Sequence, residues 1–81
     1  MLTDYIQAAL ELAHYEILPE DQTYYGEIPG IQGVYANEPT LEACRKELQQ
    51  ALEDWLLFSL SRGLPIPVIE GLDLNVKLGA A

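Results

Sequence analysis

The order of turn and cap signals in residues 24–67 constrains the fold of this chain more than any other feature. Two runs rich in tyrosine and aliphatic residues flank the turn sequence Pro29–Gly30–Ile31–Gln32–Gly33, which is the pattern of strands joined by a tight connection. Pro39 and Thr40 then introduce an amphipathic segment that ends at Gly63. This order predicts two strands followed by one long helix.

The clearest single element is a helix over residues 40–62. Thr40 is a favourable N-cap, Glu42 suits the positive start of a helix, and Arg62 suits its negative end. Apolar and small side chains recur at steps of three and four and define a buried face. These residues are Leu41, Cys44, Leu48, Ala51, Leu52, Trp55 and Ser59. Leu57 and Phe58 lie off this face, so a single sheet contact does not explain them.

Alternation with period two predicts strands at 14–18 and 23–28, with 19–22 as a hairpin connection and 34–36 as a short third strand. Connections this short indicate an antiparallel meander. Two sets of residues should face opposite sides of the sheet: Tyr15, Ile17, Tyr24, Gly26 and Ile28 against His14, Glu16, Thr23, Tyr25 and Glu27. Gly26 either leaves room for a closely packed helix or marks a bulge.

Residues 3–13 have the spacing of a helix, with Ile6, Ala9, Leu10 and Ala13 on one face. Residues 64–78 read as a C-terminal strand region, in which two prolines favour an edge position. The predicted fold is a single α+β domain over residues 1–81. It comprises a three-stranded antiparallel meander plus a fourth short strand, covered by one long helix, with an extra N-terminal helix.

The charge balance favours basic partners. Thirteen acidic residues against four basic ones give a net charge of −9, which argues against direct contact with nucleic acid phosphates. A well-solvated surface is the alternative explanation. The sequence has no apolar run long enough to span a membrane and no basic segment before Asp4. With a single cysteine, this composition favours the reducing cytoplasm.

A core from 81 residues is thin, and small domains of this kind need an additional source of stability. Cys44 has no second cysteine to pair with, and one cysteine plus one histidine make a poor zinc site. Oligomerisation remains, so we expect a homo-dimer or homo-tetramer. The interface candidates are the off-face pair of the long helix and two residues of the alternating tail: Leu57, Phe58, Leu74 and Val76.

We expect no catalysis, metal or cofactor. Glu16 and Glu27 should face the same side of adjacent strands, but no further acid is placed to complete a magnesium-binding cluster. Cys44 falls on the apolar helix face, where a packed thiol is more plausible than a nucleophile paired with His14.

Acids surround the first hairpin, and tyrosines lie on its strands. The tyrosines either cover the sheet or serve an interface, where aromatic residues are enriched. We predict a partner-binding surface for a basic protein at Glu16, Glu20, Asp21, Tyr25 and Glu27.

Three segments together resemble the HicB-like antitoxin domain: EIPGIQGV at 27–34, PTLEA at 39–43 and GLPIP at 63–67. The resemblance implies a β-β-β-α-β partial RNase H-like fold that lacks RNase H activity. It also implies an antitoxin that binds and inactivates a small mRNA-cleaving toxin, HicA.

Full-length members of that family often carry a C-terminal DNA-binding segment. Here fourteen residues follow Pro67, and their pattern is that of a strand. The N-terminal helix is a second departure. The expectation is therefore a stand-alone HicB-like domain that masks a basic toxin. The alternative is a self-assembling structural or regulatory homo-oligomer without a toxin partner, with or without a ligand site between subunits.

Overall fold

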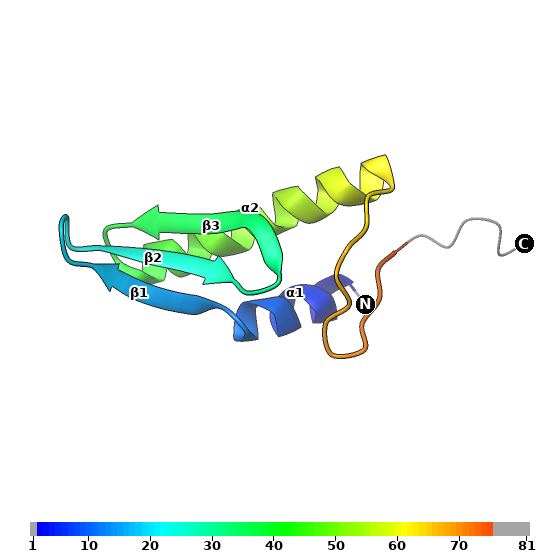
Figure 1. Ribbon diagram of the computed structural model, residues 1–81, viewed down its shortest axis with the longest axis horizontal. Coiled ribbons are helices and arrows are strands. Elements are labelled where there is room, and N and C mark those ends of the chain that lie inside the picture. The colour runs from blue at the N-terminus through cyan, green and yellow to red at the C-terminus, as the bar shows by residue number, and fades with distance from the viewer. Residues whose placement is uncertain (1, 76–81) are drawn as a thin grey trace, which may run out of the picture.

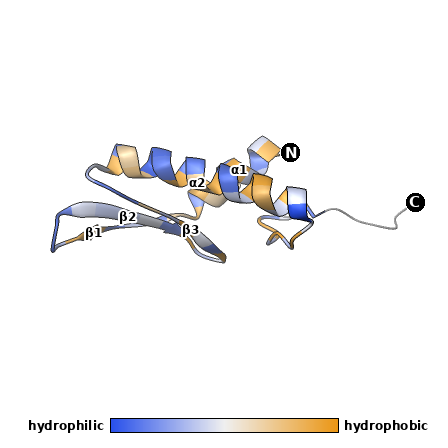
Figure 2. Ribbon diagram, turned by 90° about the horizontal axis from the view of Figure 1, so that it is seen from above, coloured by the Kyte–Doolittle hydropathy of each residue, from blue (hydrophilic) through white to orange (hydrophobic). Residues whose placement is uncertain are grey.

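A computed structural model describes residues 2–75 of the chain. The elements are α1 (Leu2–Glu11), β1 (His14–Leu18), β2 (Thr23–Ile28), β3 (Ile31–Glu38) and α2 (Leu41–Arg62). The strands form one antiparallel sheet in the order β1-β2-β3. Both helices lie on the same side of this sheet, and α2 runs along it (Figures 1 and 2). The predicted α+β meander with an N-terminal helix and a long second helix is confirmed.

The register of the sheet contains one shift that decides which side chains face outward. Ile28 pairs with Ile31 across the turn, whereas Glu27 pairs with Tyr35. The residue numbers add to 59 in the pair next to the turn and to 62 in every pair farther from the turn, a change of three. Since side chains alternate along a strand, an odd shift exchanges the two faces of β3. Val34 is therefore buried beneath the sheet, and Tyr35 faces outward.

The ends of α2 follow the predicted local chemistry. The Oγ1 atom of Thr40 accepts a hydrogen bond from the backbone N–H of Ala43, which satisfies a free donor in the first turn. Gly63 has φ 65°, and its N–H donates to the carbonyl of Leu60. This left-handed conformation favours glycine because it has no Cβ.

The buried face of α2 differs from the predicted one in its last turns. It consists of Cys44, Leu48, Leu52, Leu56 and Ser59. Leu41 is 40% exposed and Trp55 is only half-buried, while Leu56 is buried although the prediction omitted it. Steps of four residues rotate the buried stripe by about 40° each, because an α-helix has about 3.6 residues per turn. The stripe thus turns from the sheet toward α1, which contacts α2.

The prediction placed Ile17 beside Tyr15 on the covered side of the sheet, and the structure leaves Ile17 59% exposed. The reason is the lateral position of α2, which packs mainly against β3, less against β2, and hardly against β1. The covered side of β1 is therefore partly open to solvent.

Helix α1 contributes Tyr5, Ala8 and Ala9 to the core. The sequence pattern had pointed to Ala9 but not to Tyr5, which is fully buried. The hydroxyl of Tyr5 donates a hydrogen bond to the carbonyl of Pro67, a contact between residues 62 positions apart. Tyr5 thus joins the two ends of the domain.

The predicted fourth strand is not formed in the part of the chain that the structure describes. Residues 64–75 make only an isolated bridge between Ile69 and Leu72. Because Pro65 and Pro67 have no N–H, Ile66 carries the only backbone donor of residues 65–67. The side-chain amide of Asn75 bonds both the N–H and the carbonyl of Ile66, at 2.7 and 2.8 Å, and so takes the place of a strand.

Candidate functional site

The side of the sheet that faces away from the helices carries acidic, aromatic and polar side chains, which we call the outer face. The strand register arranges them in two rows across β1, β2 and β3. These rows are His14–Glu27–Tyr35 and Glu16–Tyr25–Asn37. Neighbours in such rows are close enough to interact directly. The outer face is therefore a compact group of two carboxylates, two phenols, an imidazole and an amide.

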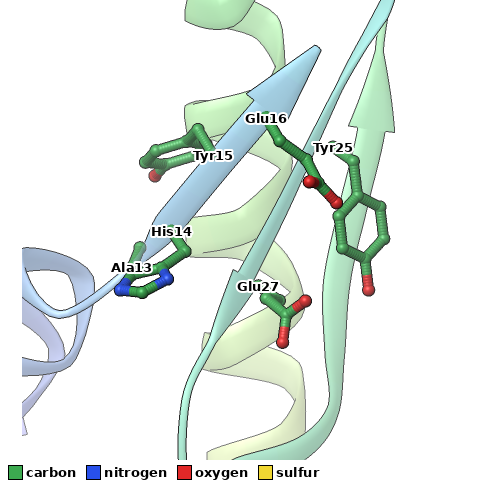
Figure 3. A pocket seen from close by; sticks show the side chains of 6 residues that line it. All are labelled: Ala13, His14, Tyr15, Glu16, Tyr25 and Glu27. Carbon is green, nitrogen blue, oxygen red and sulfur yellow. The ribbon is translucent and has the colours of Figure 1, made fainter. Parts of the chain in front are cut away.

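A shallow hollow of about 390 Å³ lies at the β1 end of these rows. It is lined by Ala13, His14, Tyr15, Glu16, Tyr25 and Glu27. Figure 3 shows the carboxylates of Glu16 and Glu27 beside the Tyr25 ring. Partial burial raises the pKa of Tyr25, and the charge of Glu27, the Tyr35 phenol and the charge of Glu16 add to this effect in decreasing order. The same negative potential favours a cationic group in the hollow.

Tyr25 and Tyr35 form a stacked pair on the outer face. Their ring centroids are 6.3 Å apart and their planes differ by 25°. Tyr35 is 60% exposed, so its ring presents a large apolar area to solvent next to Glu27. Aromatic faces beside carboxylates are suited to a guanidinium or ammonium group, since the ring attracts the cation and the carboxylate pairs with it.

The structure separates the five predicted partner-binding residues into two groups. Glu16, Tyr25 and Glu27 meet at the hollow, whereas Glu20 and Asp21 lie in the connection between β1 and β2. Asp21 has a structural role there, because its Oδ1 accepts hydrogen bonds from the Oγ1 and the N–H of Thr23 at 2.7 and 3.3 Å. Glu20 is exposed beside it.

Asn37 continues this network from β3. Its Nδ2 donates to the Oγ1 of Thr23 at 2.8 Å and to the carbonyl of Tyr24 at 2.9 Å. The hairpin end of the outer face is thus fixed by side-chain hydrogen bonds. Sequence reasoning missed Asn37 and the stacking of Tyr35, since both depend on the shifted register of β3.

The four residues predicted to form an oligomer interface differ in their exposure. Leu57 is 70% exposed, and Phe58 is half-exposed with the guanidinium carbon of Arg62 4.9 Å above its ring centroid. Leu57 lines an apolar hollow of about 320 Å³ between α1 and α2, together with Leu2, Ile6, Glu53, Leu56 and Leu60. Leu74 packs partly buried against the chain's own core. Val76 lies outside the described residues.

Cys44 and His14 lie on opposite sides of the sheet. The Cys44 thiol is buried, and its Sγ atom lies 3.6 Å from the carbonyl oxygen of Ala36. Burial, with the charge of Glu38, raises the pKa of this thiol, so it stays protonated and packs as a small apolar group. His14 is exposed on the outer face. Within residues 2–75 no three histidine, cysteine or acidic side chains are grouped so as to hold a metal ion.

Neither described helix has the length and apolar character needed to cross a membrane. The two described helices, together with the meander that lies between them in the sequence, define a small α+β domain. One face of its sheet is acidic and aromatic. The chain belongs to the UPF0150-like family, whose model matches residues 4–67.

The chain is also similar to a solved structure. The crystal structure of TTHA0281 from Thermus thermophilus superposes with a TM-score of 0.82. The two sequences are 46% identical over 90% of this chain and 96% of the other. No curated protein matches the chain.

Proposed function

We propose that this protein is a non-catalytic, cytoplasmic HicB-like protein of the antitoxin type that binds and masks a small basic mRNA-cleaving toxin similar to HicA. Two findings support the proposal at the level of the family. The UPF0150-like family is related to HicB-like antitoxins. The segments at 27–34, 39–43 and 63–67 also resemble the corresponding turns and caps of HicB-like domains.

The observation that carries the proposal is the outer face itself. Glu16 and Glu27 flank the Tyr25 ring, which stacks on Tyr35 in a chain of net charge −9. A protein that cleaves mRNA needs basic side chains to hold phosphates. An acidic surface with exposed aromatic rings is complementary to such a site and competes with RNA for it.

The proposed role is binding without chemistry. The outer face offers two carboxylates and one imidazole beside two phenols. Two-metal hydrolysis of RNA needs a set of several carboxylates that binds both ions. Glu16 and Glu27 are only two carboxylates, and such a set needs more. The arrangement instead suits charge-assisted hydrogen bonds to arginine or lysine side chains of a partner.

The test is co-expression with the small basic protein that we expect to be encoded beside this gene. We expect the two proteins to co-purify, and the paired change Glu16→Lys and Glu27→Lys to lower the association rate about tenfold or more, because steering by opposite charges is lost. The dependence of that rate on salt should also weaken.

The matched control reverses two exposed acids on α2, Glu42→Lys and Glu47→Lys, which lie away from the outer face. It changes net charge by the same amount, so an equal loss of association in both variants would show a general charge effect and contradict the proposed surface. An unchanged rate in the outer-face variant would remove this surface from the proposal.

A self-assembling homo-oligomer without a toxin is the second candidate. The observation in its favour is the apolar hollow between α1 and α2, beside the 70% exposed Leu57. If the purified chain forms a closed homo-oligomer and no basic protein co-purifies, the second function is favoured. Leu57→Lys should then lower the mass measured by sedimentation, whereas Leu41→Lys at the other end of α2 should not.

A further inference from the structure

Strand β1 has a free edge. In the sheet order β1-β2-β3 its only neighbour is β2, so within residues 2–75 one row of its backbone N–H and C=O groups has no strand partner. Proteins usually cover or disable such edges, since they are templates for pairing with another strand. No proline interrupts β1, and α2 barely reaches it.

The side chains of β1 include an apolar one that the helices leave uncovered. Ile17 points to the covered side of the sheet yet is 59% exposed, and Tyr15 beside it is half-buried. On the outer face the same strand carries His14 and Glu16, which are both exposed. Thus β1 has an uncovered apolar side, a free edge, and two side chains of complementary chemistry two positions apart.

We propose that β1 pairs antiparallel with β1 of a second copy of this chain, around a two-fold axis at Tyr15, to form a continuous six-stranded sheet. This inference is independent of the proposed toxin and of the apolar hollow between α1 and α2. A two-fold contact uses the same patch on both copies, and β1 is such a self-complementary patch.

The register follows from charge. An axis at Glu16 would place two carboxylates directly opposite each other, which destabilises a strand pair. An axis at Tyr15 places Glu16 opposite His14 of the second copy, twice, so that each carboxylate meets an imidazole. On the other side, Tyr15 meets its own copy, and Ile17 lies opposite Ala13 of the second copy, the half-buried apolar residue that directly precedes β1. This pairing covers the exposed Ile17 side chain.

The pairing has a consequence for the outer face. Directly opposite residues of antiparallel strands point to the same side of a sheet, so both copies keep their helices on one side and their outer faces on the other. The two hollows next to Glu16 then belong to one continuous surface. Tyr25 and Tyr35 lie on β2 and β3 and remain accessible.

The experiment uses two variants of the full chain, each with one cysteine added at an exposed position of β1. Opposite residues in antiparallel strands have Cα atoms about 4.5–5.5 Å apart, which is within disulfide range. We expect an equimolar mixture of His14→Cys and Glu16→Cys to form a disulfide-linked dimer under mild oxidation. Each variant alone should cross-link poorly, because two residues of offset add about 7 Å along the strand. The wild-type chain contains only the buried Cys44 and therefore measures the background level of cross-linking.

The cross-linking pattern tests both the pairing of β1 with its copy and the register of that pairing. A mixed dimer seen by non-reducing electrophoresis supports the pairing and its register. Efficient cross-linking of Glu16→Cys with itself would overturn the register. A wild-type chain that sediments as a monomer at every concentration, or a mixture without cross-links, would overturn the pairing. Ile17→Lys should weaken the wild-type dimer about tenfold or more, and circular dichroism would show that this variant is folded.

Discussion

At Gly26 the absence of a side chain lets β2 pass close above α2. A Cβ atom at this position would lie 2.8 Å from two ring carbons of Tyr15 and 3.2 Å from the Sγ of Cys44. The first distance is too short for any relaxed contact, so the Tyr15 ring would have to move. Of the two roles that the sequence left open for Gly26, close packing is the one observed, since the register shift falls between Glu27 and Ile28.

We therefore expect Gly26→Ala to destabilise the fold by about 1–3 kcal/mol, the usual cost of overpacking. Urea denaturation would measure the free energy of unfolding. In a Tyr15→Ala background the same substitution should cost clearly less, because the ring that it displaces is gone. Equal costs in both backgrounds would contradict the contact.

Tyr5 makes stability depend on alkaline pH. Burial raises the pKa of Tyr5 above its ordinary value of 10.0. Since the raised value belongs to the folded state, its contribution is fully present below the unfolded-state pKa and is lost as pH rises through the folded-state pKa. We expect the free energy of unfolding to fall as pH rises through 10.0, the value at which unfolded tyrosine is half-ionised.

Urea denaturation at a series of alkaline pH values would measure this fall. Tyr5→Phe should make the slope shallower while lowering stability by about 1–3 kcal/mol near neutral pH, because the carbonyl of Pro67 loses its donor. Tyr24→Phe, which removes one phenol and leaves the hydrogen bond between Tyr5 and Pro67 in place, is the matched control and should keep the slope. A slope unchanged by Tyr5→Phe would count against the buried phenol as its source.

At the scale of the element, α2 begins and ends where local chemistry dictates. We expect Thr40→Ala to destabilise the protein by about 1 kcal/mol, because the N–H of Ala43 loses its acceptor. Thr40→Ser keeps a hydroxyl in place and should retain most of the stability. Thermal unfolding followed by circular dichroism would compare the variants, and a Thr40→Ala protein as stable as wild type would show that the cap contributes nothing.

The C-terminal segment shows where element prediction fails. Residues 72–78 alternate as a strand does, yet the described part of that segment is held by side-chain bonds. The Oδ1 of Asp73 accepts from the N–H and the Nδ2 of Asn75, which in turn bonds Ile66. Alternation reports only which side chains share a face, and it says nothing of whether a neighbouring strand offers its backbone.

At the scale of the whole molecule, the surfaces divide by chemistry. The outer face is acidic and aromatic, and the α1–α2 side carries an apolar hollow. The free edge of β1 lies beside the first of these surfaces. The proposed binding of a basic protein and the proposed pairing with a second copy therefore use adjacent surfaces that share Glu16. Tyr25 and Glu27 belong to the first surface alone, and the free backbone edge of β1 belongs to the second alone.

The candidate site was predictable in part. Glu16, Tyr25 and Glu27 were expected together, and the simple register of the β1–β2 hairpin brings them together. Tyr35 and Asn37 reach the outer face only through the three-residue shift in β3. Asp21 was read as a partner contact because its acidity is visible in the sequence, whereas its hydrogen bonds to Thr23 are not.

The sequence by itself determined the caps of α2, the first hairpin and the antiparallel order of the strands, because these depend on residues a few positions apart. The third strand was expected only at 34–36, and residues 31–33, which were read as part of the turn before it, in fact begin β3 (Ile31–Glu38). The tertiary structure alone decided that Leu56 rather than Trp55 is buried, that Ile17 remains exposed, and that Tyr5 reaches Pro67. These features depend on how far α2 lies from β1 and on how α1 meets the far end of the chain. Such placements result from the packing of all elements at once, and no local pattern encodes them.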